Sequence, residues 1–155
     1  MKAFLSIVLT LLLASFVSAS GQKPNWRSPT GKVQLKRPFA PGKFNWNAGH
    51  RGVDLGGHRG QNIVSPADGE VFFVGNIAGK KTLSIKHTAH LRSTFEPVIS
   101  PLKKGDMVKK GQVIGTLLAD HEACPECLHW GVKTGERYLN PLLFLNLQHA
   151  ILLPR

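Results

Sequence analysis

Short apolar runs separated by turn residues fill the chain from residue 33 onwards. Val, Ile, Leu and Phe dominate these runs, and Gly, Pro, Asn or Asp bound them. This pattern is typical of antiparallel strands in a sandwich or barrel, and not of strands alternating with helices. The predicted strands are 52–55, 62–66, 70–74, 82–85, 93–99, 106–108, 112–118 and 128–132. One short helix is predicted within 138–147, because Pro141 is favourable in a first helical turn. The sequence therefore predicts an all-β, antiparallel fold.

The N-terminal segment differs from the rest of the chain. Lys2 precedes a compact apolar stretch over 4–16, and small residues follow at 17–19. This order is typical of a secretory signal peptide, and the stretch is shorter than the roughly 20 residues of a transmembrane helix. We therefore predict a signal peptide over 1–19 and a location outside the cytoplasm, secreted or in the cell envelope. An uncleaved signal is the alternative, and it is the only route to a membrane that the sequence offers.

Composition narrows the class of protein further. The chain has 155 residues, a net charge of +11, two cysteines and 42% apolar residues. That apolar share excludes a disordered tail, and two cysteines exclude a disulfide-dense miniprotein. The length fits one domain, predicted over 33–147 after a polar linker at 20–32 and before a tail at 148–155.

The positive charge does not indicate a nucleic-acid-binding protein. Lys and Arg are spread along the chain, and no basic ribbon rich in aromatic residues accompanies them. Outside the cytoplasm, the same charge favours attraction to anionic cell-wall polymers.

His50 and Asp54 are a candidate pair of metal ligands. Imidazole nitrogen and carboxylate oxygen both bind Zn²⁺. On a straight strand their Cα atoms would be about 13 Å apart, so sharing one ion requires a bend. Gly49 and Gly52 make such a bend possible. The alternative is a surface histidine near an aspartate that caps a strand.

His129 is the candidate third ligand. It lies in an apolar, strand-like run, where an imidazole without a partner would be unfavourable. Three protein ligands leave the fourth position of zinc for water, which is typical of a catalytic site. The alternative is a core histidine satisfied by hydrogen bonds.

Cys124 and Cys127 allow three interpretations. A small disulfide loop is the simplest in an oxidising compartment. A thioredoxin-like redox role would require the motif to open a helix, whereas here it precedes a strand. A Cys127 thiolate could also bind zinc and close its open position, which would make the site structural.

Four ordered sequence blocks resemble the M23 metallopeptidases, the lysostaphin-like or LytM-like peptidoglycan endopeptidases. The blocks are GHRGVDL (49–55), VSPADGEV (64–71), GDMVKKGQVIG (105–115) and CLHWGV (127–132). The resemblance implies an antiparallel groove fold of the duplicated-hybrid-motif type. It also implies one Zn²⁺ held by His50, Asp54 and His129, and peptidoglycan as the partner.

The chain departs from this family pattern at two positions. Cys127 stands where the first histidine of an HxH motif is usual, and Pro97 stands where a second catalytic histidine is usual. The segments STFEPV and CLHWG resemble a subgroup common in secreted actinobacterial proteins. His87 and His121 are the candidate catalytic substitutes for the missing histidines.

The function predicted from these residues is that of a secreted zinc metalloendopeptidase, which hydrolyses peptide bonds in peptidoglycan stems or cross-bridges. One alternative is a catalytically degenerate M23-like module that binds the cell wall or regulates an amidase. Another is an adhesion module held by a structural zinc or a disulfide.

Overall fold

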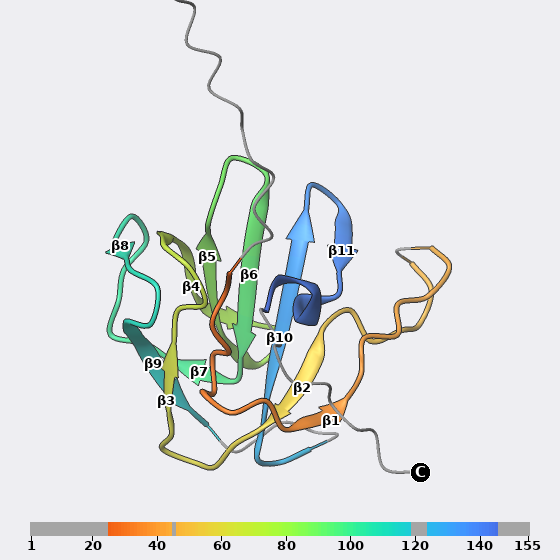
Figure 1. The fold of residues 1–155 in the computed structure, drawn as a ribbon, viewed down its shortest axis with the longest axis horizontal. Coiled ribbons are helices and arrows are strands. Elements are labelled where there is room, and N and C mark those ends of the chain that lie inside the picture. The colour runs from red at the N-terminus through yellow and green to blue at the C-terminus, as the bar shows by residue number, and fades with distance from the viewer. Residues whose placement is uncertain (1–24, 45, 119–123, 146–155) are drawn as a thin grey trace, which may run out of the picture.

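The computed structural model describes residues 25–44, 46–118 and 124–145 (Figure 1). The predicted signal peptide, His121 and the C-terminal tail lie outside the described residues. The elements in chain order are β1 (Leu35–Arg37), β2 (Val53–Gly56), β3 (Asn62–Val64), β4 (Gly69–Ile77), β5 (Lys80–Lys86), β6 (Leu91–Glu96), β7 (Val98–Ile99), β8 (Met107–Val108), β9 (Val113–Leu117), β10 (Cys127–Thr134), β11 (Arg137–Leu139) and the 3-10 helix η1 (Pro141–Phe144). None of the helical turns in the described ranges is long and apolar enough to cross a bilayer.

The strands form two antiparallel sheets. The larger has the order β1-β2-β10-β6-β5-β4-β8, and β11 also pairs with β10. The smaller has the order β3-β9-β7. In Figure 1, β10 and β6 stand side by side at the centre of the molecule, with β3, β7 and β9 gathered at one side. The predicted all-β fold is confirmed.

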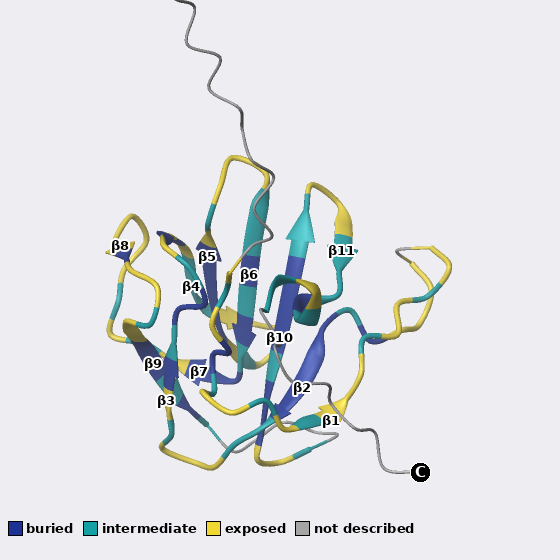
Figure 2. Ribbon diagram, in the orientation of Figure 1, coloured by how far each residue is buried: buried dark blue, intermediate teal, exposed yellow. Residues whose placement is uncertain are grey.

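The hydrophobic core lies on one face of the large sheet. Successive strand residues point to opposite faces, so every second residue of β6 and β10 enters the core. Phe95 and Trp130 are completely buried and are cross-strand partners. In Figure 2 the deepest burial follows β2, β9 and much of β10, whereas the far end of β10 is half-buried. The residues between these core positions of β6 and β10 point to the opposite face of the sheet, which carries polar side chains.

One predicted strand needs correction, and two further strands were not predicted. The strand predicted over 93–99 is two strands, β6 and β7, which belong to different sheets. Pro97 separates them, because proline cannot donate a ladder hydrogen bond. The short helix predicted within 138–147 is the 3-10 turn η1, which has Pro141 in its first turn, and it follows strand β11, which was not predicted. Strand β1 was not predicted from the sequence.

The described part of the predicted linker, residues 25–32, is attached to the domain. The Trp26 amide donates to the Phe144 carbonyl at 2.9 Å, and the Arg27 amide donates to the Pro66 carbonyl at 2.9 Å. The Trp26 and Phe144 rings stack with centroids 4.5 Å apart. Aromatic packing and backbone hydrogen bonds therefore hold this segment against the strands, which composition alone did not reveal.

Candidate metal centre

Three side chains from two distant parts of the chain meet on the polar face of the large sheet. Asp54 lies on β2 and His129 on β10, and the two are direct cross-strand partners. His50 precedes β2 and is fixed by two backbone hydrogen bonds with Ala40, of 2.8 and 3.0 Å. The chain turns between His50 and Asp54, which is the bend that their spacing requires.

The potential ligand atoms of the three residues form a small triangle. His50 Nε2 lies 3.0 Å from Asp54 Oδ1 and 3.1 Å from His129 Nδ1. His129 Nδ1 lies 2.8 Å from Asp54 Oδ1. Asp54 is fully buried, whereas the His129 side chain retains 17% of its exposure. One nitrogen from each imidazole and one carboxylate oxygen therefore converge on a point that solvent can approach from one side.

A hydrogen bond between His50 and the Pro38 carbonyl determines which ring nitrogen of His50 carries the proton. Its Nδ1 lies 2.7 Å from the Pro38 carbonyl, which can only accept, so Nδ1 carries the proton. In neutral His50, Nε2 then carries a lone pair, and this lone pair faces the carboxylate oxygen of Asp54. Two acceptors at this distance repel unless a proton or a cation lies between them. A shared cation would satisfy all three atoms, and two imidazole nitrogens with one carboxylate oxygen are a donor set that suits zinc.

Gly52 allows the bend to approach His129. A Cβ atom on Gly52 would lie 2.5 Å from the Trp130 carbonyl oxygen and 2.7 Å from His129 Nε2. Real side-chain atoms do not approach so closely, so a larger residue would displace the His129 ring. Gly49 is similarly enclosed, because its Cβ would lie 2.2 Å from the Gly42 amide nitrogen. Both glycines are therefore required for close approach of the backbone.

A cavity of about 520 Å³ opens over the triangle. Its walls come from the segment around His50, the turn between β4 and β5, and the polar faces of β5, β6, β10 and β11. Gly131, two residues after His129 on β10, also lines this trough-shaped cavity and has no side chain to narrow it. An extended peptide could lie along this trough, parallel to β6 and β10.

Glu96 is a site residue that the sequence reasoning missed. It is the cross-strand partner of His129 on β6 and lines the same cavity. Thr82 Oγ1 donates to Glu96 Oε2 at 3.3 Å, which orients the carboxylate. The alternation of STFE could have indicated it, because Thr94 and Glu96 must share a face while Ser93 and Phe95 take the other.

His87 is not brought to the triangle. Its Nδ1 donates to the Asp68 carbonyl at 2.9 Å, and its Nε2 accepts from Ser93 Oγ at 2.8 Å. Ser93 is fully buried on the core face of β6, and the Trp26 ring lies 4.6 Å from the imidazole. Burial lowers the pKa of His87. The imidazole of His87 therefore lies on the face of the sheet opposite His129, away from the triangle, and its catalytic role stays a prediction. The role predicted for His121 stays a prediction.

The two departures from the family pattern lie close to the triangle. Cys127 begins β10 two residues before His129 and is joined to Cys124 by a disulfide. Of the three interpretations of this motif, the structure has the disulfide, which leaves no thiolate for a metal. Pro97 is buried directly after Glu96. Neither position can accept or donate a proton.

Comparison with known proteins decides the family. Residues 48–141 match the model of Peptidase family M23, and this match spans the triangle, the cavity and the disulfide. The chain belongs to Peptidase family M23.

Two proteins with known names or sources are similar in sequence to this M23 chain. It is 36% identical over 149 residues to an uncharacterized protein of Mycobacterium tuberculosis, covering 91% of this chain and 59% of the relative. It is 33% identical over 136 residues to the murein hydrolase activator NlpD of Salmonella typhimurium, covering 85% of this chain and 34% of NlpD. The chain thus spans 59% or less of the length of these two relatives.

Solved M23-like structures share the fold. Helicobacter pylori Csd3 superposes with a TM-score of 0.66 and 33% identity, covering 79% of this chain and 35% of Csd3. A zinc-containing peptidase of Vibrio cholerae superposes with a TM-score of 0.62 and 25% identity, covering 76% of this chain and 39% of that protein.

Proposed function

We propose that this M23 chain is a zinc metalloendopeptidase that hydrolyses peptide bonds in peptidoglycan stems or cross-bridges. The triangle of His50, Asp54 and His129 at the base of an open cavity carries the proposal. The three atoms lie 2.8 to 3.1 Å from one another, so one divalent cation between them would contact all three. A zinc-containing peptidase among the structural relatives supports the choice of metal.

In this proposal, three residues bind the metal and a fourth transfers the proton. His50 Nε2, Asp54 Oδ1 and His129 Nδ1 would hold zinc, and the Pro38 carbonyl fixes the tautomer of His50. Bound zinc would act as a Lewis acid and would make water at the site more acidic. Glu96 is the carboxylate of the cavity that we assign to accepting and returning the proton of the attacking water, in place of the histidines replaced by Cys127 and Pro97.

The cellular setting follows from the same proposal. Residues 1–19 would direct export as a signal peptide, and the domain would act outside the cytoplasm. The net charge of +11 would draw it to anionic wall polymers and hold it near its substrate.

A second function has an observation in its favour. Cys127 and Pro97 replace both usual catalytic histidines, and one relative is named as an activator of murein hydrolases. In this alternative, the domain binds peptidoglycan or an amidase and stimulates hydrolysis by another enzyme. Retention of all three metal-ligand types favours the peptidase.

Digestion of purified cell walls separates the two functions. Zinc-loaded protein is incubated with wall fragments, and the released peptides are identified by mass spectrometry. We expect new peptide termini from the wild type, none from Asp54→Asn, and a rate lower by about 10²–10⁴-fold from Glu96→Gln. His58→Ala, at an exposed histidine outside the cavity, should behave as the wild type. Release only in the presence of a second wall hydrolase would support the activator and overturn the peptidase.

A further inference from the structure

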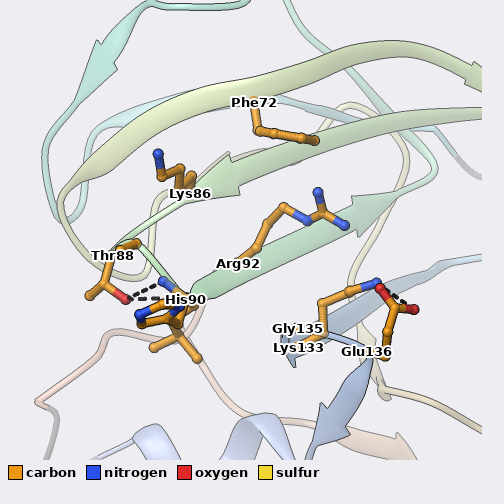
Figure 3. A pocket seen from close by; sticks show the side chains of 10 residues that line it. Phe72, Lys86, Thr88, His90, Arg92, Lys133, Gly135 and Glu136 are labelled. Carbon is orange, nitrogen blue, oxygen red and sulfur yellow. Dashed lines mark hydrogen bonds and ion pairs between the residues drawn. The ribbon is translucent and has the colours of Figure 1, made fainter.

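A row of three cations crosses the sheet on the same face as the metal-ligand triangle. Arg92 on β6 is the direct cross-strand partner of Lys86 on β5 and of Lys133 on β10. Paired residues of antiparallel strands point to the same face, so three positive side chains stand next to one another. Figure 3 shows Arg92 between Lys86 and Lys133. Like charges directly opposite each other are destabilising, so this arrangement favours an anion that offsets the repulsion.

The guanidinium of Arg92 is held in place. Its Cζ lies 4.4 Å from the centroid of the Phe72 ring, at cation–π distance (Figure 3). Its Nε is buried and has no hydrogen-bond partner among the residues that the structure describes. A buried donor without a partner is unfavourable, and a planar guanidinium recognises a carboxylate with two parallel hydrogen bonds. The Phe72 ring and the burial of Nε therefore hold Arg92 in one orientation, and an incoming carboxylate would meet the two terminal nitrogens of its guanidinium.

Acidic side chains only partly balance the row. Lys133 Nζ lies 3.9 Å from Glu136 Oε2, and the Glu136 side chain is 91% exposed at the rim. Glu70 on β4 is the cross-strand partner of Lys86 on its other side. Arg92, at the centre, has a cation on both sides.

The cation row is continuous with the groove over the triangle. It lines a cavity of about 340 Å³, and Arg92 and Lys133 also line the larger cavity above His129. Arg92 lies four residues from Glu96 on β6, and Lys133 lies four residues from His129 on β10. Four residues of strand span about 13 Å. A group bound by Arg92 would therefore belong to the same extended ligand as a bond placed at the triangle.

We infer that Lys86, Arg92 and Lys133 form a subsite for a free carboxylate of a peptide, about four residues from the bond at the triangle. This inference rests on the proposed function and names the class of substrate: extended peptides that carry an unamidated carboxylate. A carboxylate is favoured over the phosphate of a wall polymer, because the row continues a cavity bordered by the strands β6 and β10, along which an extended peptide would lie.

Binding measurements with matched ligands test the inference. Two peptidoglycan stem peptides, one with free carboxylates and one with carboxamides, are titrated against zinc-loaded wild type, Arg92→Gln and Arg59→Gln. Arg59 lies in an exposed turn between β2 and β3, so its variant removes the same charge elsewhere. We expect Arg92→Gln to weaken binding of the free-carboxylate peptide about tenfold, the usual effect of a lost charged hydrogen bond. Binding of the carboxamide peptide should change less than about twofold, and Arg59→Gln should affect neither.

Three results would overturn the subsite. One is an equal loss for both peptides, and another is no binding of the free-carboxylate peptide by the wild type. The third is Arg92-dependent binding of a glycerol-phosphate polymer that is tighter than that of either peptide.

Hydrolysis is recorded in parallel and separates the two proposals. Cleavage that is indifferent to the carboxylate would remove the subsite and leave the peptidase. Carboxylate-dependent binding without cleavage would remove the peptidase and leave the subsite.

Discussion

His129 and Trp130 are neighbours on β10 and show how differently the two faces of the large sheet are used. Trp130 is fully buried against Phe95 on the core face, whereas His129 joins Asp54 and His50 on the groove face. His87 and Ser93 belong with Trp130, since the Trp130 indole N–H points to Ser93 Oγ at 3.5 Å. A histidine on the groove face is accessible to a metal ion or a ligand. A histidine on the core face is packed against other side chains, and its ring nitrogens are already hydrogen-bonded. Four predictions test this division.

The largest effect is expected from removal of the core aromatic. Trp130→Ala should lower the free energy of unfolding by about 3–5 kcal/mol, because it leaves a cavity among completely buried side chains. Denaturant unfolding with a metal chelator present measures this change without any contribution from zinc. Trp130→Phe, which keeps an aromatic ring, should lose less. A loss below about 1 kcal/mol for Trp130→Ala would contradict the assignment of this face to the core.

Removal of the neighbouring histidine should act on metal binding instead. His129→Ala should weaken zinc binding more than about 100-fold, since even residues that only support metal ligands can contribute that much. Isothermal titration of the metal-free protein measures the affinity, and His58→Ala serves as the matched control. Unchanged zinc affinity in His129→Ala would show that the triangle is not a metal site.

A side chain at Gly52, where the backbone closely approaches β10, should have an intermediate effect on stability. Gly52→Ala would place its Cβ against the Trp130 carbonyl and the His129 ring, and should reduce stability by about 1–3 kcal/mol. Zinc affinity should fall as well, because the His129 ring must move. The control is Gly131→Ala, whose Cβ would lie 3.5 Å from its nearest neighbour, the Arg51 carbonyl oxygen. Equal losses in both variants would exclude the proposed close approach at Gly52.

The smallest effect concerns the pH dependence of stability. Burial lowers the pKa of His87 below its unfolded value, so the unfolded chain binds this proton first as the pH falls. The contribution of His87 to stability is therefore complete above about pH 6.5 and declines at lower pH. His87→Gln should show a smaller loss of stability between pH 7.5 and pH 5 than the wild type, as measured by unfolding in urea with a chelator. An unchanged difference would indicate that His87 is not held neutral by the core.

The strand pattern could be predicted from the sequence because it depends on local alternation. Short apolar runs between turn residues indicated most strands within a few residues, and the four sequence blocks indicated the family. The turn of β6 into β7 was missed, because only the packing of two sheets shows that a run interrupted by Pro97 changes partners. The attachment of Trp26 was missed for the same reason, since its contact with Phe144 joins opposite ends of the domain.

Residue types with a marked chemistry, such as His50, Asp54, His129 and the two cysteines, were identifiable from spacing and family resemblance alone. Glu96 and Arg92 were not, because charged residues are common on strands and nothing local distinguishes them. Only the pairing of β5, β6 and β10 places Glu96 beside His129 and Arg92 between two lysines. The position of His87 on the core face could not be predicted for the same reason. The sequence by itself thus determined most strands, the family and the candidate metal ligands, since these depend on composition and order. The tertiary structure decided which charged residues share a face with the candidate metal ligands, because strand register is set by contacts between segments far apart in the chain.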